Sequence, residues 1–136
     1  MQMITFLIKI FIIGFFLNLL YELLHSLLYK TCLEAKLPKY IYLILKACIF
    51  DAVLIVTIYY FSFLIFQNQN LFLNFYQTAF VVLVSIIFAY FYEIYAINNK
   101  RWEYSKAMPK IFGAGITPII QIALTGILTY YLALYF

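Results

Sequence analysis

Four long apolar runs alternate with three short polar connections along the 136-residue chain. The apolar runs cover residues 7–29, 43–66, 77–97 and 117–136. Each is about twenty residues long, enough for a helix to cross a hydrocarbon core of about 30 Å. Polar and apolar residues do not alternate within the runs, so membrane strands are not indicated. We therefore predict an all-α, polytopic membrane protein, a bundle of four transmembrane helices that forms one domain over residues 1–136.

The composition supports this prediction and excludes several classes of protein. Hydrophobic residues make up 68% of the chain and charged residues only 10%. A soluble domain is about 45–50% apolar and about 25% charged, so a soluble enzyme and a disordered chain are both excluded. Cys32 and Cys48 form neither a C-x-x-C motif nor a zinc-binding quartet, and we expect two reduced thiols.

The basic residues predict the orientation of the chain. Lys and Arg number nine, and only Lys9 lies toward the side of the termini. The other eight lie on the side of the first and third connections: Lys30, Lys36, Lys39, Lys46, Lys100, Arg101, Lys106 and Lys110. The positive-inside rule makes connections 30–42 and 98–116 cytoplasmic and puts both termini outside. Because these residues flank apolar runs and form no basic stripe with interleaved aromatics, we expect no nucleic-acid partner.

Polar residues within the spans gather at the predicted cytoplasmic ends. A charge at the bilayer centre costs about 2.5–3.5 kcal/mol on insertion scales, so each is a candidate for function. Four residues at the end of the first run share one helix face: Asn18, Glu22, His25 and Tyr29. Asp51 is expected about two turns into the second helix. Glu93 lies on a small-residue face of the third helix, and Gln121 lies on the fourth.

These residues are competent for catalysis. The candidate catalytic residues are Glu22, His25, Asp51 and Glu93. Carboxylates that lie close together in a low dielectric share protons, which makes one of them a general acid. The alternative is a structural network of hydrogen bonds, or side chains that reach the membrane interface.

The same four residues are candidate metal ligands. Glu22-x-x-His25 matches the E-x-x-H pair of helical carboxylate metal sites. Because the pair occurs once, at most a single divalent metal is expected. No other cofactor is indicated.

The third connection offers groups that suit a lipid head group. Arg101 presents a planar fork for phosphate or carboxylate, and the alternative is a basic loop that lies on anionic lipid. Thr117 followed by Pro118 predicts an N-cap and first helical position, with free amides directed at the polar cluster. The candidate substrate-binding residues are Asn18, Arg101, Trp102, Tyr104, Thr117 and Gln121.

Three patches of the chain resemble a group of small, multi-pass bacterial membrane proteins of uncharacterised function. Their patterns are N-x-x-W-E-x-x-H, R-W-x-Y-x-x-x-M-P and G-x-G-x-[ST]-P-x-x-Q. They match here from Asn18 to His25, from Arg101 to Pro109 and from Gly113 to Gln121. The one departure is Tyr21 in place of Trp. The resemblance implies a protein of the bacterial inner membrane and brings no known activity.

Three functions remain open from the sequence. The first is an enzyme that acts on a lipid or isoprenoid from the cytoplasmic leaflet, by acid/base or single-metal chemistry. The second is a small ion- or proton-coupled transporter or channel, expected to be a homo-oligomer because four helices enclose little volume. The third is a structural accessory subunit of a membrane complex.

Overall fold

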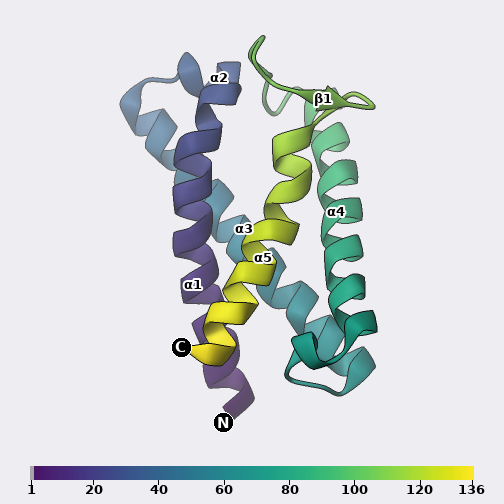
Figure 1. The fold of residues 1–136 in the computed structure, drawn as a ribbon. Helices are drawn as coiled ribbons and strands as arrows, with labels where there is room; N and C mark the ends of the chain where they lie inside the picture. Colours follow the sequence, from purple (N-terminus) through teal and green to yellow (C-terminus); the bar gives the residue numbers. More distant parts are fainter. Residues whose placement is uncertain (1) are drawn as a thin grey trace.

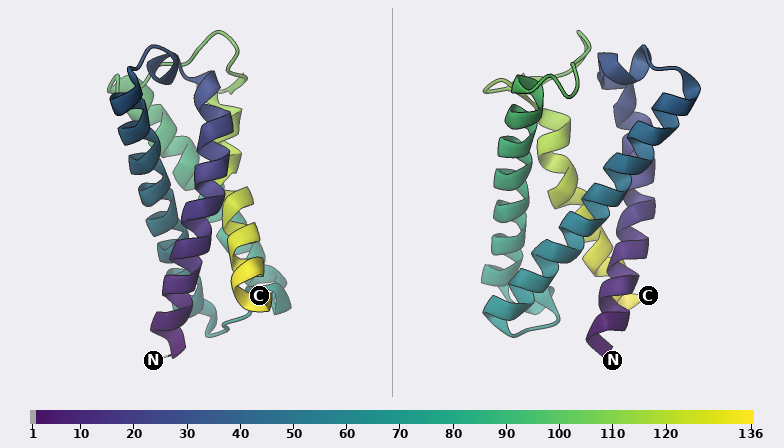
Figure 2. Two further views of the ribbon diagram at one scale, coloured as in Figure 1. Left: turned by 90° about the vertical axis from the view of Figure 1, so that its left-hand side faces the viewer. Right: turned by 180° about the vertical axis from the view of Figure 1, so that it is seen from behind.

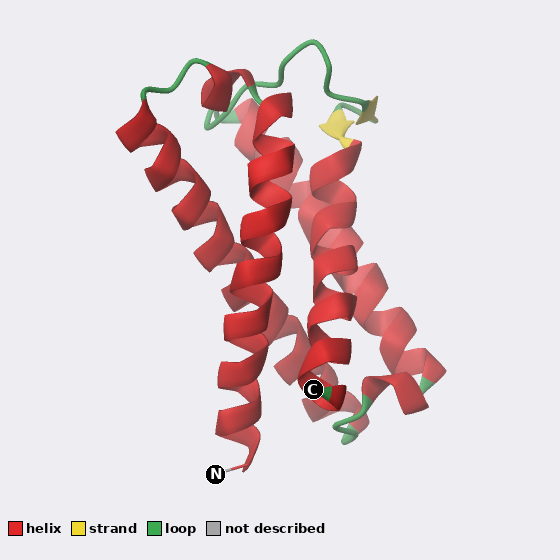
Figure 3. Ribbon diagram, turned by 60° about the vertical axis from the view of Figure 1, so that its left-hand side comes forward, coloured by secondary structure: helices red, strands yellow, loops and turns green. Residues whose placement is uncertain are grey.

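Four long helices dominate the computed structural model, which describes residues 2–136 (Figure 1). They are α1 (Gln2–His25), α3 (Leu37–Phe66), α4 (Phe75–Asn98) and α5 (Ile116–Tyr135). The short elements are η1 (Ser26–Leu28), α2 (Lys30–Leu33), η2 (Leu71–Leu73), β1 (Lys110–Ile111) and β2 (Ala114–Gly115). Figure 3 shows how little of the chain lies outside helices. The prediction of an all-α fold is confirmed, and each long helix is long and apolar enough to cross a membrane.

The long helices run alternately up and down the bundle. Both termini and the connection 67–74 lie at one end, which we call the terminal end (Figure 1). Connections 26–36 and 99–115 lie at the opposite end, which we call the site end. This arrangement places the basic connections together, as the sequence predicts.

The predicted start of the second helix is wrong by six residues, because α3 begins at Leu37 and not at 43. Pro38 lies in its first turn, where a missing backbone N–H leaves no hydrogen bond unmade. Asp51 is therefore about four turns into α3, not two. The first helix also differs: α1 begins at Gln2 and ends at His25.

The inclination of α3 explains how Asp51, near its midpoint, still reaches the site end. Figure 2 shows α3 crossing the bundle diagonally and separating from α4 toward the site end. α1 packs closely on α3 and α5, whereas α4 packs mainly on α5. The predicted small-residue face of α4 is buried, as expected for close packing: Ser85, Ala89, Glu93 and Ala96.

The interior of the terminal half is mainly apolar. Its buried cluster consists of Ile10, Ile55, Ile58, Tyr59, Leu71, Val81, Ile122, Tyr130 and Ala133. Below it, Gln77 donates to the Ser62 hydroxyl at 2.9 Å and to the Asn68 carbonyl at 3.0 Å. These bonds fix connection 67–74 onto the helix ends. Buried polar side chains thus occur at both ends, but the carboxylates lie only at the site end.

The predicted start of the fourth helix is also wrong. α5 begins at Ile116 with Gly115 as its N-cap residue, so Thr117 is not the N-cap and Pro118 is not the first helical residue. The preceding hairpin of β1 and β2 explains the shift, because it pairs Lys110 with Gly115 and carries the chain directly into α5. Its turn residues both have positive φ, Phe112 at 47° and Gly113 at 86°, as a type I′ turn requires.

Candidate functional site

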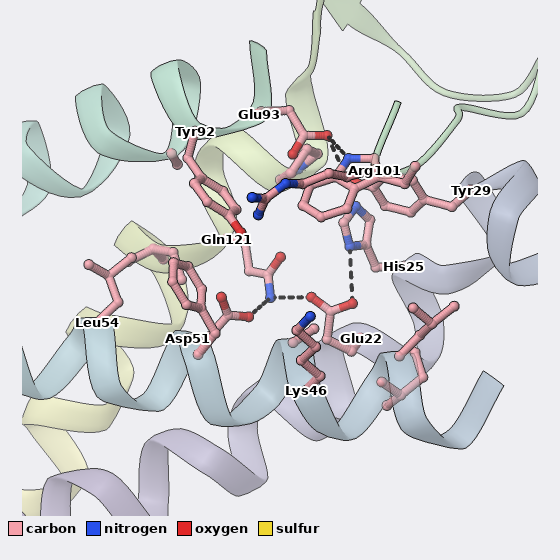
Figure 4. A pocket seen from close by; sticks show the side chains of 18 of the residues that line it. Glu22, His25, Tyr29, Lys46, Asp51, Leu54, Tyr92, Glu93, Arg101 and Gln121 are labelled. Carbon is pink, nitrogen blue, oxygen red and sulfur yellow. Dashed lines mark hydrogen bonds and ion pairs between the residues drawn. The ribbon is translucent and has the colours of Figure 1, made fainter. Parts of the chain in front are cut away.

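A cavity of about 440 Å³ lies at the site end of the bundle (Figure 4). All four long helices and the residues that follow α4 contribute to its wall. The predicted residues in this wall are Glu22, His25, Asp51, Glu93, Arg101, Trp102 and Gln121. The structure therefore brings together all four residues that the sequence singles out for catalysis.

Gln121 of α5 joins two carboxylates from different helices. Its Nε2 lies 2.7 Å from Oε1 of Glu22 and 2.8 Å from Oδ2 of Asp51. An amide nitrogen carries two protons, and these two shortest contacts use both. No lysine or arginine within residues 2–136 forms an ion pair with either carboxylate. A single neutral amide thus bridges two acids inside the bundle.

Asn18 supports this bridge from the terminal side. Its Oδ1 accepts from the Thr125 hydroxyl at 3.1 Å and lies 3.2 Å from Nε2 of Gln121. Its Nδ2 donates to the Gly14 carbonyl at 2.8 Å. Asn18 is fully buried and does not line the cavity. The sequence assigns it to substrate binding, whereas its contacts orient Gln121.

His25 is buried beside Glu22, and neither of its ring nitrogens makes a hydrogen bond within residues 2–136. Only 5% of the residue is exposed. Its Nδ1 lies 3.8 Å from Oε2 of Glu22, too far for a hydrogen bond. The rings of Tyr21 and Tyr29 pack edge-on against it. Buried nitrogens without partners are uncommon, and here they border a cavity (Figure 4).

Glu93 of α4 is the best satisfied carboxylate of the cavity. One oxygen, Oε1, accepts three hydrogen bonds from groups outside α4. The donors are the Tyr104 hydroxyl at 2.7 Å, the Tyr29 hydroxyl at 2.9 Å and the Trp102 indole at 3.1 Å. Tyr104 in turn accepts from the Gly115 backbone N–H at 2.8 Å. Glu93 therefore joins the end of α1, the third connection and the start of α5.

The two connections at the site end are paired with each other, which closes that end of the bundle. Tyr29 and Tyr104 form an antiparallel bridge, and the Lys30 backbone N–H donates to the Glu103 carbonyl at 2.9 Å. The Lys30 ammonium also pairs with the Glu103 carboxylate at 3.2 Å. Burial and the nearby Glu93 carboxylate raise the pKa of Tyr29 and Tyr104 above the usual range. Both hydroxyls therefore remain donors in moderately alkaline solution.

Three predicted substrate-binding residues have other roles in the structure. Trp102 and Tyr104 donate to Glu93, although Trp102 also lines the cavity. The Thr117 hydroxyl contacts the sulfur of Met108 at 3.4 Å and its residue does not line the cavity.

The first turn of α5 has few amides left for an anion. The Gly115 N–H is bound to Tyr104, the Ile116 N–H donates to the Pro109 carbonyl at 2.8 Å, and Pro118 has no N–H. Within residues 2–136, the Thr117 N–H is the one amide of this turn left for an anion, so the helix end predicted to direct free amides at the polar cluster keeps a single donor.

The four candidate metal ligands divide into two groups. Within residues 2–136, no three His, Cys, Asp or Glu side chains are arranged to hold one metal ion. Glu93 is engaged by its three donors, and Glu22 and Asp51 are held by Gln121. The donor set within residues 2–136 therefore does not fit a divalent metal.

Sequence patterns assign no role at the site to Lys46 and Tyr29, two residues of the cavity wall. Lys46 predicts only the topology, although it precedes Asp51 by five positions on α3. Tyr29 is predicted only to share a helix face with His25. It lies beyond α1 in an extended conformation, and only the tertiary fold directs its hydroxyl to Glu93.

Comparison with known proteins finds no match for this chain. No protein-family model, no curated protein and no solved structure matches it significantly. The resemblance of its three patches to small bacterial membrane proteins stays a prediction.

Proposed function

We propose that the chain is a four-span protein of a bacterial cytoplasmic membrane, with the site end cytoplasmic and both termini outside. Four apolar helices and the large apolar side chains exposed around them support insertion. Eight of the nine basic residues lie on the side of the site end, which supports the orientation.

The function that the geometry supports best is proton-transfer chemistry on a lipid or isoprenoid, reached from the cytoplasmic leaflet. One observation carries this proposal. Glu22 and Asp51 share a single amide donor at the wall of a cavity of about 440 Å³, beside His25, whose nitrogens have no hydrogen-bond partner within residues 2–136. Two carboxyl groups held together under one neutral donor are suited to act as acid and base.

The roles follow from the contacts of each side chain. Glu22 and Asp51 exchange the proton with the substrate, and His25 hydrogen-bonds its reacting group. Gln121 positions the two carboxylates. Glu93 is a structural residue in this scheme, because its Oε1 already accepts three hydrogen bonds.

The apolar cluster of the terminal half favours an enzyme over a transporter. Ile55, Tyr59, Ile122 and Tyr130 fill the bundle directly below the polar site. A transport path needs polar groups or water at every depth of the membrane. Within residues 2–136, the lining of the cavity reaches no farther toward the terminal end than Leu54 and Phe88, near the midpoints of α3 and α4.

The test is turnover of a bacterial lipid extract in proteoliposomes, followed by mass spectrometry of all lipid species. We expect the wild type to convert at least one species, and the Glu22→Gln/Asp51→Asn variant to lose this conversion by about 100-fold or more. The matched control is Glu34→Gln, an exposed acid of connection 26–36 that does not line the cavity.

Circular dichroism and gel filtration must show that each variant is folded. Unchanged lipid in the wild type, or full conversion by the folded double variant, would refute the proposal.

A further inference from the structure

Two cations line the mouth of the cavity without a carboxylate partner. Lys46 of α3 and Arg101 of the third connection are both exposed, and neither forms an ion pair within residues 2–136. The Lys46 ammonium lies 5.9 Å from the centroid of the Tyr42 ring. The Arg101 guanidinium lies 4.9 Å from the Tyr95 ring and donates to its hydroxyl at 3.3 Å. Aromatic contacts orient these cations but leave their charge for a ligand.

The wall between α3 and α4 is apolar and faces outward. Phe50 stacks on Tyr92 with ring centroids 4.9 Å apart, and Phe88 stacks on the same tyrosine at 5.9 Å. Phe50 and Phe88 are 38% and 39% exposed, although both line the cavity. Leu43 and Leu54 extend this surface along α3. It suits a hydrocarbon chain that leaves the cavity between the two helices.

The interior of the cavity disfavours an anion and favours an uncharged polar group. Glu22, Asp51 and Glu93 all line it, and each would repel a phosphate. Among the described residues that line it, His25 is the buried polar side chain whose nitrogens lack a hydrogen bond. A ligand that carries a phosphate and an uncharged polar group would thus keep the phosphate at the mouth of the cavity. Its uncharged group would form a hydrogen bond with His25.

We propose that the site binds an anionic lipid whose phosphate head group carries no attached cation, with the phosphate between Lys46 and Arg101 and its hydrocarbon chain between α3 and α4. The proposal rests on the function proposed above and names the substrate class of that site. The lipid is oriented as in the cytoplasmic leaflet. Lys46 and Asp51 are five residues apart on α3, which is less than about two helical turns. The reacting part of the lipid therefore lies close to its head group.

The one tryptophan of the chain gives a direct assay of binding. Trp102 lines the cavity, so a lipid with brominated chains quenches its fluorescence when it occupies the site. The protein is reconstituted in phosphatidylcholine bilayers, and either brominated phosphatidic acid or brominated phosphatidylcholine is added in increasing proportion. We expect the phosphatidic acid to quench at a lower proportion, with an apparent affinity about tenfold or more higher.

Variants test whether the two cations cause this preference. Lys46→Gln/Arg101→Gln should abolish it, and Lys46→Arg/Arg101→Lys should retain it. Lys39→Gln is the matched control, since Lys39 lies on α3 two turns before Lys46 and does not line the cavity. The proposal fails if the wild type shows no preference, if the folded double Gln variant keeps it, or if Lys39→Gln loses it equally.

A further experiment distinguishes a lipid ligand from free phosphate. Inorganic phosphate is added at constant ionic strength, and we expect the lipid preference to remain. If inorganic phosphate removes it, the site takes free phosphate and the lipid assignment is overturned.

The two measurements distinguish a failure of the binding proposal from a failure of the proposed enzyme activity. Glu22→Gln should keep the lipid preference, because Glu22 does not contact the two cations. If the protein prefers phosphatidic acid but converts no lipid, the proposed enzyme activity is overturned and the binding proposal stands. If it converts an uncharged lipid and shows no preference for phosphatidic acid, the proposed phosphate site is overturned and the enzyme activity stands.

Discussion

Glu93 and the Glu22–Asp51 pair border one cavity, yet they are bound in opposite ways. Glu93 collects three donors on one oxygen, all from segments outside its own helix. These donors are Tyr29, Trp102 and Tyr104. The pair shares the single amide of Gln121, and in the part of the chain that the structure describes the His25 nitrogens next to it have no hydrogen-bond partner.

This contrast separates a carboxylate that stabilises the fold from carboxylates that are free to react. Removing an acceptor that satisfies several buried donors leaves each of them without a partner, which costs stability. Two acids under one neutral donor contribute little to stability, so replacing them by amides costs little. Sites that trade stability for chemistry behave in this way.

The largest expected effect on stability is that of Glu93→Ala. The change leaves Tyr29, Trp102 and Tyr104 without their acceptor, and we expect a loss of about 3 kcal/mol or more. The measurement is thermal unfolding in detergent, followed by circular dichroism. Glu34→Ala is the control for loss of an acid and should leave the midpoint unchanged. Equal midpoints for Glu93→Ala and the wild type would remove the contrast.

The amide variants of Glu22 and Asp51 should lose activity and keep their stability. We expect Glu22→Gln and Asp51→Asn to unfold within about 1 kcal/mol of the wild type, because an amide oxygen still accepts from Gln121. Their lipid turnover should fall by about 100-fold or more. Unfolding and turnover are measured on the same preparations. A loss of stability as large as that of Glu93→Ala would make the pair structural too.

Gly115→Ala should weaken the Glu93 contacts and leave the pair intact. A Cβ at Gly115 would lie 2.8 Å from the Met108 sulfur and 3.1 Å from Cδ of Pro118. The third connection must then shift, at a cost of about 1–3 kcal/mol. A change in Trp102 fluorescence together with a lower midpoint of thermal unfolding would show that the third connection has shifted.

Gly126→Ala is the matched control on α5. Its added Cβ would meet only ordinary contacts, the nearest at 3.7 Å. Alanine is also the better helix former, so the midpoint should stay equal or rise. The same loss in both variants would mean that the close contact at Gly115 is not the cause.

The smallest expected effect is on the pH dependence of stability. The pKa of Tyr104 is raised in the folded protein by burial and by its hydrogen bond to Glu93. Its contribution is complete below the unfolded pKa, about 10, and is lost as the pH rises through the higher folded pKa. Tyr104→Phe should therefore make stability fall less steeply above about pH 10, by up to about 1.4 kcal/mol per pH unit.

The control for this comparison is Tyr42→Phe, an exposed tyrosine of α3. Unfolding midpoints are measured between neutral and strongly alkaline pH. The same slope for Tyr104→Phe and the wild type would exclude a stabilising role for this hydroxyl.

The sequence predicts the helices of this fold well because apolar length is a strong signal. It also predicts that the polar residues gather at one end, since alternating spans place Glu22 and Glu93 at the same end. Helix starts are predicted less well. Pro38 lies in the first turn of α3, although the prediction leaves it outside the second helix. Pro118 is the third residue of α5 and not the first.

Tertiary contacts account for what the sequence could not predict. The inclination of α3 brings Asp51 to Gln121 from the middle of a long helix. The pairing of the two connections gives Glu93 three partners from two segments. Neither follows from the spacing of residues along one helix. The functional assignment of these residues stays a prediction.

The position of Gln121 in the last span constrains how the protein is made. Spans enter the membrane in the order of synthesis, so Glu22 and Asp51 are inserted before the amide that bridges them exists. A three-span intermediate therefore carries two acids without their shared donor and an unfilled place for α5. The finished protein differs from this intermediate in that one amide of the last span hydrogen-bonds both acids.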